Sequence, residues 1–87
     1  MATSEPIASD LAVPPGEYLH EVLDEVGMSQ ADLSRRLGRP VEAVDEIVRG
    51  AKAITPETAL QLEQVLAVPA HVWSGLEDAY RLALAEG

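Results

Sequence analysis

The chain has no cysteine and no phenylalanine. Without cysteine it can form neither a disulfide bond nor a thiolate metal site, an absence that fits a cytoplasmic protein. Without phenylalanine its core must consist of Leu, Val, Ile and Ala, and its only large rings are Tyr18, Trp73 and Tyr80. A length of 87 residues predicts one domain with a modest core.

Long apolar runs are also missing. No stretch approaches the roughly 20 apolar residues that a membrane span needs. The first residues do not combine a basic stretch with an apolar one, as a signal peptide does. The sequence therefore predicts neither a membrane partner nor a secretory leader.

Basic residues are scarce and unevenly distributed. The formal net charge is −9, which on average disfavours binding to nucleic acid. Residues 29–52, however, contain five of the six basic residues and four acidic ones, a balance of +1. The rest of the chain has eleven acids against Arg81 alone. Total charge is therefore a poor guide to the one surface that could contact DNA phosphates.

Residues 1–13 mix Ser, Thr, Pro and acids without periodicity, which predicts a flexible acidic arm. A helical domain follows over residues 14–87. Its first helix begins at Pro14-Pro15-Gly16 and ends at Gly27, because glycine commonly follows a helix. The apolar residues of this helix recur on one face: Leu19, Val22, Leu23 and Val26.

A short turn separates the second and third helices. Ser29 is predicted to cap the second helix, with Asp32 three residues later as in a capping box. Gly38 ends this helix, and we expect a positive φ there. Pro40 is predicted at the first position of the third helix, which ends at Gly50. The expected buried stripe of the third helix is Val44, Ile47 and Val48.

Two further helices complete the domain. Thr55 and Pro56 start the fourth helix, which is predicted to extend to about Val68. Pro69 begins the fifth helix, and one face of it comprises Trp73, Leu76, Tyr80 and Leu84. The pattern favours a core position for Trp73 and leaves core and interface positions open for Tyr80. No segment alternates like a strand, so the sequence predicts an all-α fold of five helices.

Residues 29–50 have the spacing of a helix-turn-helix. Small Ser34 lets the two helices cross closely, and Gly38 permits the turn between them. Val44 and Ile47 anchor the third helix so that its opposite face stays exposed. This motif usually places its second helix in a DNA groove, but here that helix carries three carboxylates, Glu42, Asp45 and Glu46.

A family resemblance is carried by residues 15–19, 27–33 and 53–60, together with Trp73 and Tyr80. On these residues the chain resembles the Xre (lambda-repressor-like) helix-turn-helix family, and more narrowly the HigA-type antitoxins of bacterial toxin–antitoxin modules. The resemblance spans about residues 14–85. It implies a five-helix lambda-repressor-like domain that binds double-stranded operator DNA as a homodimer and neutralises a toxin ribonuclease.

Residues 38–40 and 53–60 are also similar to the front domain of longer proteins. In those proteins a HigA-like module precedes a zinc metallopeptidase of the ImmA/IrrE type. This chain contains no such peptidase.

The resemblance also implies DNA contacts. Gln30, at the start of the second helix, matches a phosphate-contacting position, and Arg49 and Lys52 match a second region that contacts the DNA backbone. The positions that read bases are Val41, Glu42 and Glu46.

Arg39 is assigned to DNA from its charge. Contact with phosphates and pairing with a nearby acid are both open for it, as they are for Arg35 and Arg36.

The acidic third helix leaves two functions open. Members of the family commonly carry Gln, Asn, Arg, Ser or Thr where this chain has Glu42 and Glu46. A carboxylate can accept a hydrogen bond from cytosine N4, but it also repels phosphates. The chain is therefore either an operator-binding regulator or a non-catalytic protein-interaction module with weak or no DNA binding.

An enzyme is not expected. His20 and Glu21 begin like a zinc-protease HExxH motif, but Asp24 occupies the place of its second histidine. The sequence shows no glycine-rich phosphate loop and no Ser/His/Asp or Cys/His pattern. It therefore predicts no cofactor and no metal.

Overall fold

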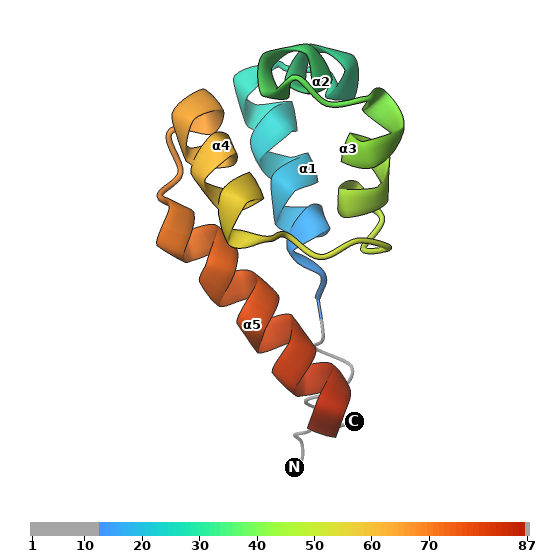
Figure 1. The fold of residues 1–87 in the computed structure, drawn as a ribbon, viewed down its shortest axis with the longest axis vertical. Coiled ribbons are helices and arrows are strands. Elements are labelled where there is room, and N and C mark those ends of the chain that lie inside the picture. Colours follow the sequence, from blue (N-terminus) through green and yellow to red (C-terminus); the bar gives the residue numbers. More distant parts are fainter. Residues whose placement is uncertain (1–12, 87) are drawn as a thin grey trace.

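The computed structural model describes residues 13–86, and these form five helices with no strand among them (Figure 1). The predicted all-α, five-helix fold is confirmed. The predicted arm, residues 1–13, lies outside the described residues except for Val13. None of the described helices is both long and apolar enough to cross a membrane. The helices are α1 (Pro15–Val26), α2 (Gln30–Leu37), α3 (Val41–Val48), α4 (Pro56–Leu66) and α5 (Ala70–Glu86).

The helix starts follow the capping chemistry of the sequence. The Ser29 hydroxyl accepts from the Asp32 N–H at 3.0 Å, and the Ser29 N–H donates to the Asp32 carboxylate at 3.3 Å. These two bonds complete the predicted capping box. Thr55 caps α4 in the same way, accepting from the Thr58 N–H at 3.2 Å.

The capping box also affects the titration of Asp32. The backbone hydrogen bond from Ser29, then the one involving its hydroxyl, hold the pKa of Asp32 below its usual value of 3.8, and Arg35 adds to the effect. Because the folded pKa is lowered, this contribution to stability is present above pH 3.8. It is lost as the pH falls through the lowered value.

Three predicted helix boundaries were wrong by one or two residues. Pro40 is the N-cap of α3 and not its first residue, because its ψ of 148° is extended while its carbonyl accepts from the first turn. Helix α4 ends at Leu66, before the predicted Val68, because Ala67 adopts a left-handed conformation with φ 64°. Pro69 disfavours a helical conformation at Val68, and α5 begins after it at Ala70.

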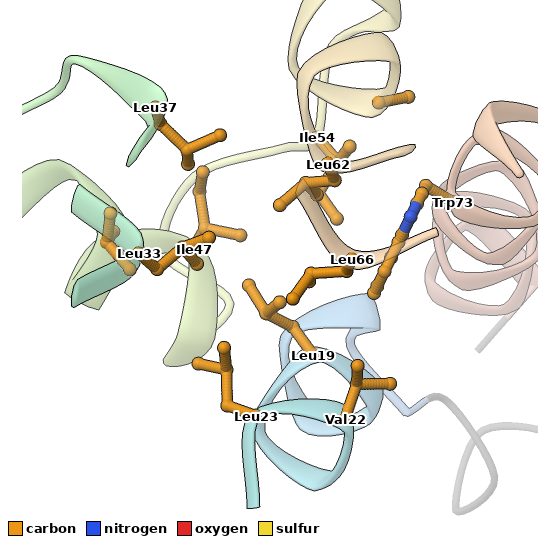
Figure 2. Close-up of a cluster of buried hydrophobic side chains, with 12 residues drawn as sticks. Leu19, Val22, Leu23, Leu33, Leu37, Ile47, Ile54, Leu62, Leu66 and Trp73 are labelled. Carbon is orange, nitrogen blue, oxygen red and sulfur yellow. The ribbon is translucent and has the colours of Figure 1, made fainter. Parts of the chain in front are cut away.

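The core joins all five helices around leucines and one indole (Figure 2). Trp73 of α5 is fully buried, which confirms its predicted core position, and its Nε1 donates to the Val68 carbonyl at 3.2 Å. The Tyr18 ring lies 5.3 Å from the Trp73 ring but remains 37% exposed, so it covers the core and is not part of it.

Two predicted apolar stripes are shorter than expected. Val26, in the last turn of α1, is 54% exposed. Leu84 is 49% exposed, because the second half of α5 extends away from the other four helices (Figure 1).

The start of α1 lies directly against the end of α3. A Cβ atom at Gly16 would lie 2.1 Å from the Ile47 carbonyl oxygen and 2.4 Å from that of Val48. Only glycine leaves room for this approach. The positive end of the α1 dipole thereby faces the carbonyls at the negative end of α3.

Glu77 of α5 is buried and connects that helix to the segment before α4. Its Oε1 accepts from the Ile54 N–H at 2.9 Å, and its Oε2 accepts from Arg81 Nε at 2.6 Å. No pattern in the sequence predicted a role for Glu77. The Glu77–Arg81 spacing of four was the available signal, but it predicts only a surface pair.

Replacement of Gly16 by Ala should lower the free energy of unfolding by about 1–3 kcal/mol, because the new methyl group would overlap the α3 carbonyls. The matched control is Gly75→Ala, within α5, where a Cβ has no atom within 4 Å. The control should raise stability by about 0.5–1 kcal/mol through helix propensity. Urea unfolding of both variants tests this; equal effects would show that the close approach is absent.

Replacement of Glu77 by Ala should destabilise the fold by about 1–3 kcal/mol, because it leaves the buried Ile54 N–H without an acceptor. Glu77→Gln keeps an acceptor oxygen and should lose clearly less. Thermal unfolding of the two variants measures the difference, and an equal loss for both would contradict the role of the Ile54 bond.

Candidate nucleic-acid interface

The turn between α2 and α3 sets the crossing of these two helices. Gly38 has φ 71°, as predicted, and its N–H donates to the Arg35 carbonyl at 3.3 Å. The next N–H, of Arg39, donates to the Ser34 carbonyl at 3.0 Å, which closes the end of α2 in a Schellman-type arrangement. Ser34 itself is buried where the helices cross. The turn therefore directs one side of α3 away from the core.

A groove of about 490 Å³ lies along this outward side of α3 and reaches the start of α2. It contains five of the seven residues predicted to contact DNA, so the predicted base-reading positions and Gln30 do come together. It also contains Asp45, which was not among the predicted contacts. The groove is lined by Gln30, Val41, Glu42, Asp45, Glu46 and Arg49.

The remaining two predicted residues, Arg39 and Lys52, lie in a second hollow of about 230 Å³. This hollow is formed between α3, the segment that follows it, and the start of α4. Glu46 lines both depressions, so they share a border. All seven predicted residues therefore lie on one stretch of surface.

The first groove is acidic. Three carboxylates line it, and its one cationic side chain, Arg49, donates to Asp45 at 2.8 Å. Both partners of that pair are about half exposed, so the pair contributes at most about 1 kcal/mol to stability. The Asp45 carboxylate nevertheless offsets part of the positive charge that Arg49 can offer to a phosphate. Phosphate contact and pairing with an acid were both open for Arg35, and in the structure it pairs with Asp32.

The second hollow has the opposite balance. Its cations are Arg39 and Lys52, and Glu46 is its single acid. Among residues 13–86, Lys52 forms no ion pair, and the Arg39 side chain donates to the neutral amide of Gln61 at 2.9 Å. Positive charge on this face is therefore concentrated beside the acidic groove and not within it.

The side chains of this surface offer hydrogen-bond and charge contacts to a ligand. Gln30 supplies an amide at the positive end of α2, Arg39 and Lys52 supply cations, and the carboxylates of α3 supply acceptors. Across the part of the chain that the structure describes, no three His, Cys, Asp or Glu side chains come together as a metal site would require. His20 and Asp24, the residue that occupies the place of the second histidine of the protease motif, form an exposed pair at 3.7 Å on α1.

Comparisons with known proteins agree with this geometry. Residues 19–73 match the helix-turn-helix family. The chain is 32% identical over 72 residues to YddM of Escherichia coli, an uncharacterised helix-turn-helix-type transcriptional regulator; the match covers 83% of this chain and 77% of YddM.

Two solved structures from Pseudomonas aeruginosa are also similar, each at 35% identity. The antitoxin HigA with the higBA promoter has a TM-score of 0.80 and covers 85% of this chain and 82% of its own. A second protein, in complex with its 18-base-pair operator DNA, has a TM-score of 0.79 and covers 84% of this chain and 80% of its own.

Proposed function

Since the chain belongs to the helix-turn-helix family, a class of DNA-binding regulators and not of enzymes, we propose that it binds double-stranded operator DNA as a regulator of the HigA antitoxin type. One observation carries the proposal: all seven residues assigned to DNA line two adjoining hollows, one along α3 and the start of α2 and the other between α3, the segment after it and the start of α4. In this arrangement α3 enters the major groove. We place this action in the cytoplasm, where a bacterial regulator meets DNA.

In the proposed complex the two hollows have different tasks. Lys52 and Arg39 contact phosphates from the second hollow, while Gln30 and Arg49 contact them at the edges of the first groove. Phosphate contacts fix the position of the protein on the duplex, and base contacts give specificity. Base reading then falls to Val41, Glu42 and Glu46, with a carboxylate accepting from cytosine N4.

The proposal includes a homodimer. The half of α5 that extends beyond the body exposes Leu82 by 61% and Leu84 by 49% (Figure 1). Apolar side chains on a protruding helix can be buried by the same helix of a second copy, which is the symmetric arrangement that suits a two-half-site operator. In this proposal the helical domain over residues 14–87 binds the DNA, and a toxin is the second protein partner.

A second function is favoured by the acidic groove. The groove contains three carboxylates that repel a phosphate backbone, those of Glu42, Asp45 and Glu46. The domain could therefore act as a protein-interaction module with weak or no DNA binding. The two functions make different predictions for substitutions in α3.

Replacement of both Arg49 and Lys52 by Ala should weaken binding to every DNA sequence to a similar extent. Loss of two phosphate contacts should also lower the slope of log K against log salt by about 2. Fluorescence titration of the DNA upstream of its gene and of a scrambled duplex, over a range of salt, measures both quantities. Arg36→Ala, which removes a cation that lines neither hollow, is the control. A change of preference between the duplexes at unchanged affinity would contradict the phosphate role.

Replacement of Glu42 and Glu46 by Gln distinguishes the two functions. For a regulator, base preference should shift by about 1–3 kcal/mol at one position of the site. For an interaction module, the change should only raise affinity for all DNA alike, since two repulsive charges are removed.

The control for this experiment is the Glu21→Gln, Glu25→Gln double variant, which makes the same charge change at the same spacing on the exposed face of α1. All variants are titrated at one fixed salt concentration. Regulator function is excluded if the unsubstituted protein binds the upstream and scrambled duplexes equally and the α3 variant gains only non-specific affinity.

A further inference from the structure

We propose that Gln61 of α4 is a positioning residue for phosphate binding, which holds Arg39 at the second hollow without neutralising its charge. No motif of the sequence drew attention to Gln61, and it lies outside both hollows. The inference rests on the proposed function, because it assigns a task to Arg39 in contact with DNA.

The side chain of Gln61 lies beside the turn between α2 and α3. Its Oε1 accepts from Arg39 Nε at 2.9 Å, and its Nε2 approaches the carbonyl of Leu37, the last residue of α2, at 3.5 Å. One amide therefore contacts the chain on both sides of Gly38. Arg39 and Gln61 are both half-buried, so this contact is less open to competition from water than a surface pair.

The neutrality of this partner distinguishes Arg39 from the other hydrogen-bonded arginines of the described chain. Arg35, Arg49 and Arg81 each donate to a carboxylate. A carboxylate partner holds a guanidinium in place but offsets its positive charge. A neutral amide partner holds the guanidinium in place without offsetting that charge. Because Nε is the atom that Gln61 engages, the two terminal nitrogens of Arg39 remain for a bidentate contact.

The surroundings of Arg39 indicate a phosphate as its ligand. Lys52 lines the same hollow, as do the hydroxyl-bearing residues Thr55 and Thr58 where α4 begins. Two cations, each without a carboxylate partner in the described chain, line a hollow of about 230 Å³ whose single acid is Glu46. Fixing Arg39 in advance lowers the entropy that its side chain loses on binding.

A double-mutant cycle tests the inference. Gln61→Met keeps the length of the side chain and removes both hydrogen bonds. It is measured with Arg39 present and in the Arg39→Ala background, by titration of a mixed-sequence duplex at one low salt concentration. We expect Gln61→Met to weaken binding 3- to 10-fold with Arg39 present and less than 2-fold without it.

Two further variants address charge and folding. Gln61→Glu keeps an acceptor for Arg39 but pairs it with a negative charge, so it should bind at least as weakly as Gln61→Met; recovery of wild-type affinity would overturn the argument from neutrality. Gln64→Met, the same change at an exposed position of α4, is the matched control and should leave affinity unchanged. Urea unfolding of each variant verifies that the protein titrated is folded.

A measurement without DNA isolates the positioning itself. Exchange of the Arg39 Nε proton with water, followed by NMR, should be slow in the wild type and fast in Gln61→Met. Equal exchange rates would overturn the inference, as would equal losses of affinity with and without Arg39. If the unsubstituted chain shows no salt-dependent binding to any duplex, the proposed function fails together with the inference. If the chain binds DNA but the losses of affinity caused by Gln61→Met and Arg39→Ala simply add, only the inference is overturned.

Discussion

The position of α3 depends on one contact between backbones, where the first turn of α1 meets the last carbonyls of α3 at Gly16. No side chain separates the two helices at this point, so their distance is fixed by atomic radii and cannot be adjusted by a change of rotamer. The segment after α3 is held nearby, since a Cβ at Gly50 would lie 3.0 Å from Pro14. The groove on the outward side of α3 is thus supported from behind by the start of α1.

The net negative charge of the chain disfavours DNA binding, whereas its helix-turn-helix fold favours it. The structure reconciles the two, because acidic and basic side chains lie in separate parts of the surface. The carboxylates of α3 surround the first groove, where Arg49 is paired with Asp45. Two cations that have no acidic partner in the described chain, Arg39 and Lys52, share the neighbouring hollow. In the proposed complex, the phosphates of a duplex therefore contact the cations of the second hollow, while its base edges face the carboxylates of the first groove. The net charge of −9 says nothing about this division.

Features encoded by neighbouring residues could be predicted from the sequence. The caps at Ser29 and Thr55 and the left-handed turn at Gly38 depend on residues within four positions of each other. Apart from Arg39, which was assigned from its charge, the residues assigned to DNA were taken from the family resemblance, and the structure places them in two adjoining hollows. Contacts between distant segments could not be predicted: Gln61 binds Arg39 across 22 positions, and Glu77 binds Ile54 across 23. Neither residue belongs to a periodic pattern, because its partner is determined only by how the helices pack.

Helices α2 and α3 have eight residues each, which is too short for a helix to persist in water without tertiary support. The surface proposed to contact DNA therefore exists only while the whole domain is folded, and it cannot persist in an isolated fragment of α2 and α3. Occupancy of a duplex and folding of the domain are then thermodynamically linked: a bound duplex acts as a folding ligand and raises the melting temperature in proportion to the logarithm of its concentration. Conversely, any condition that unfolds the core around Trp73 releases the DNA at the same time.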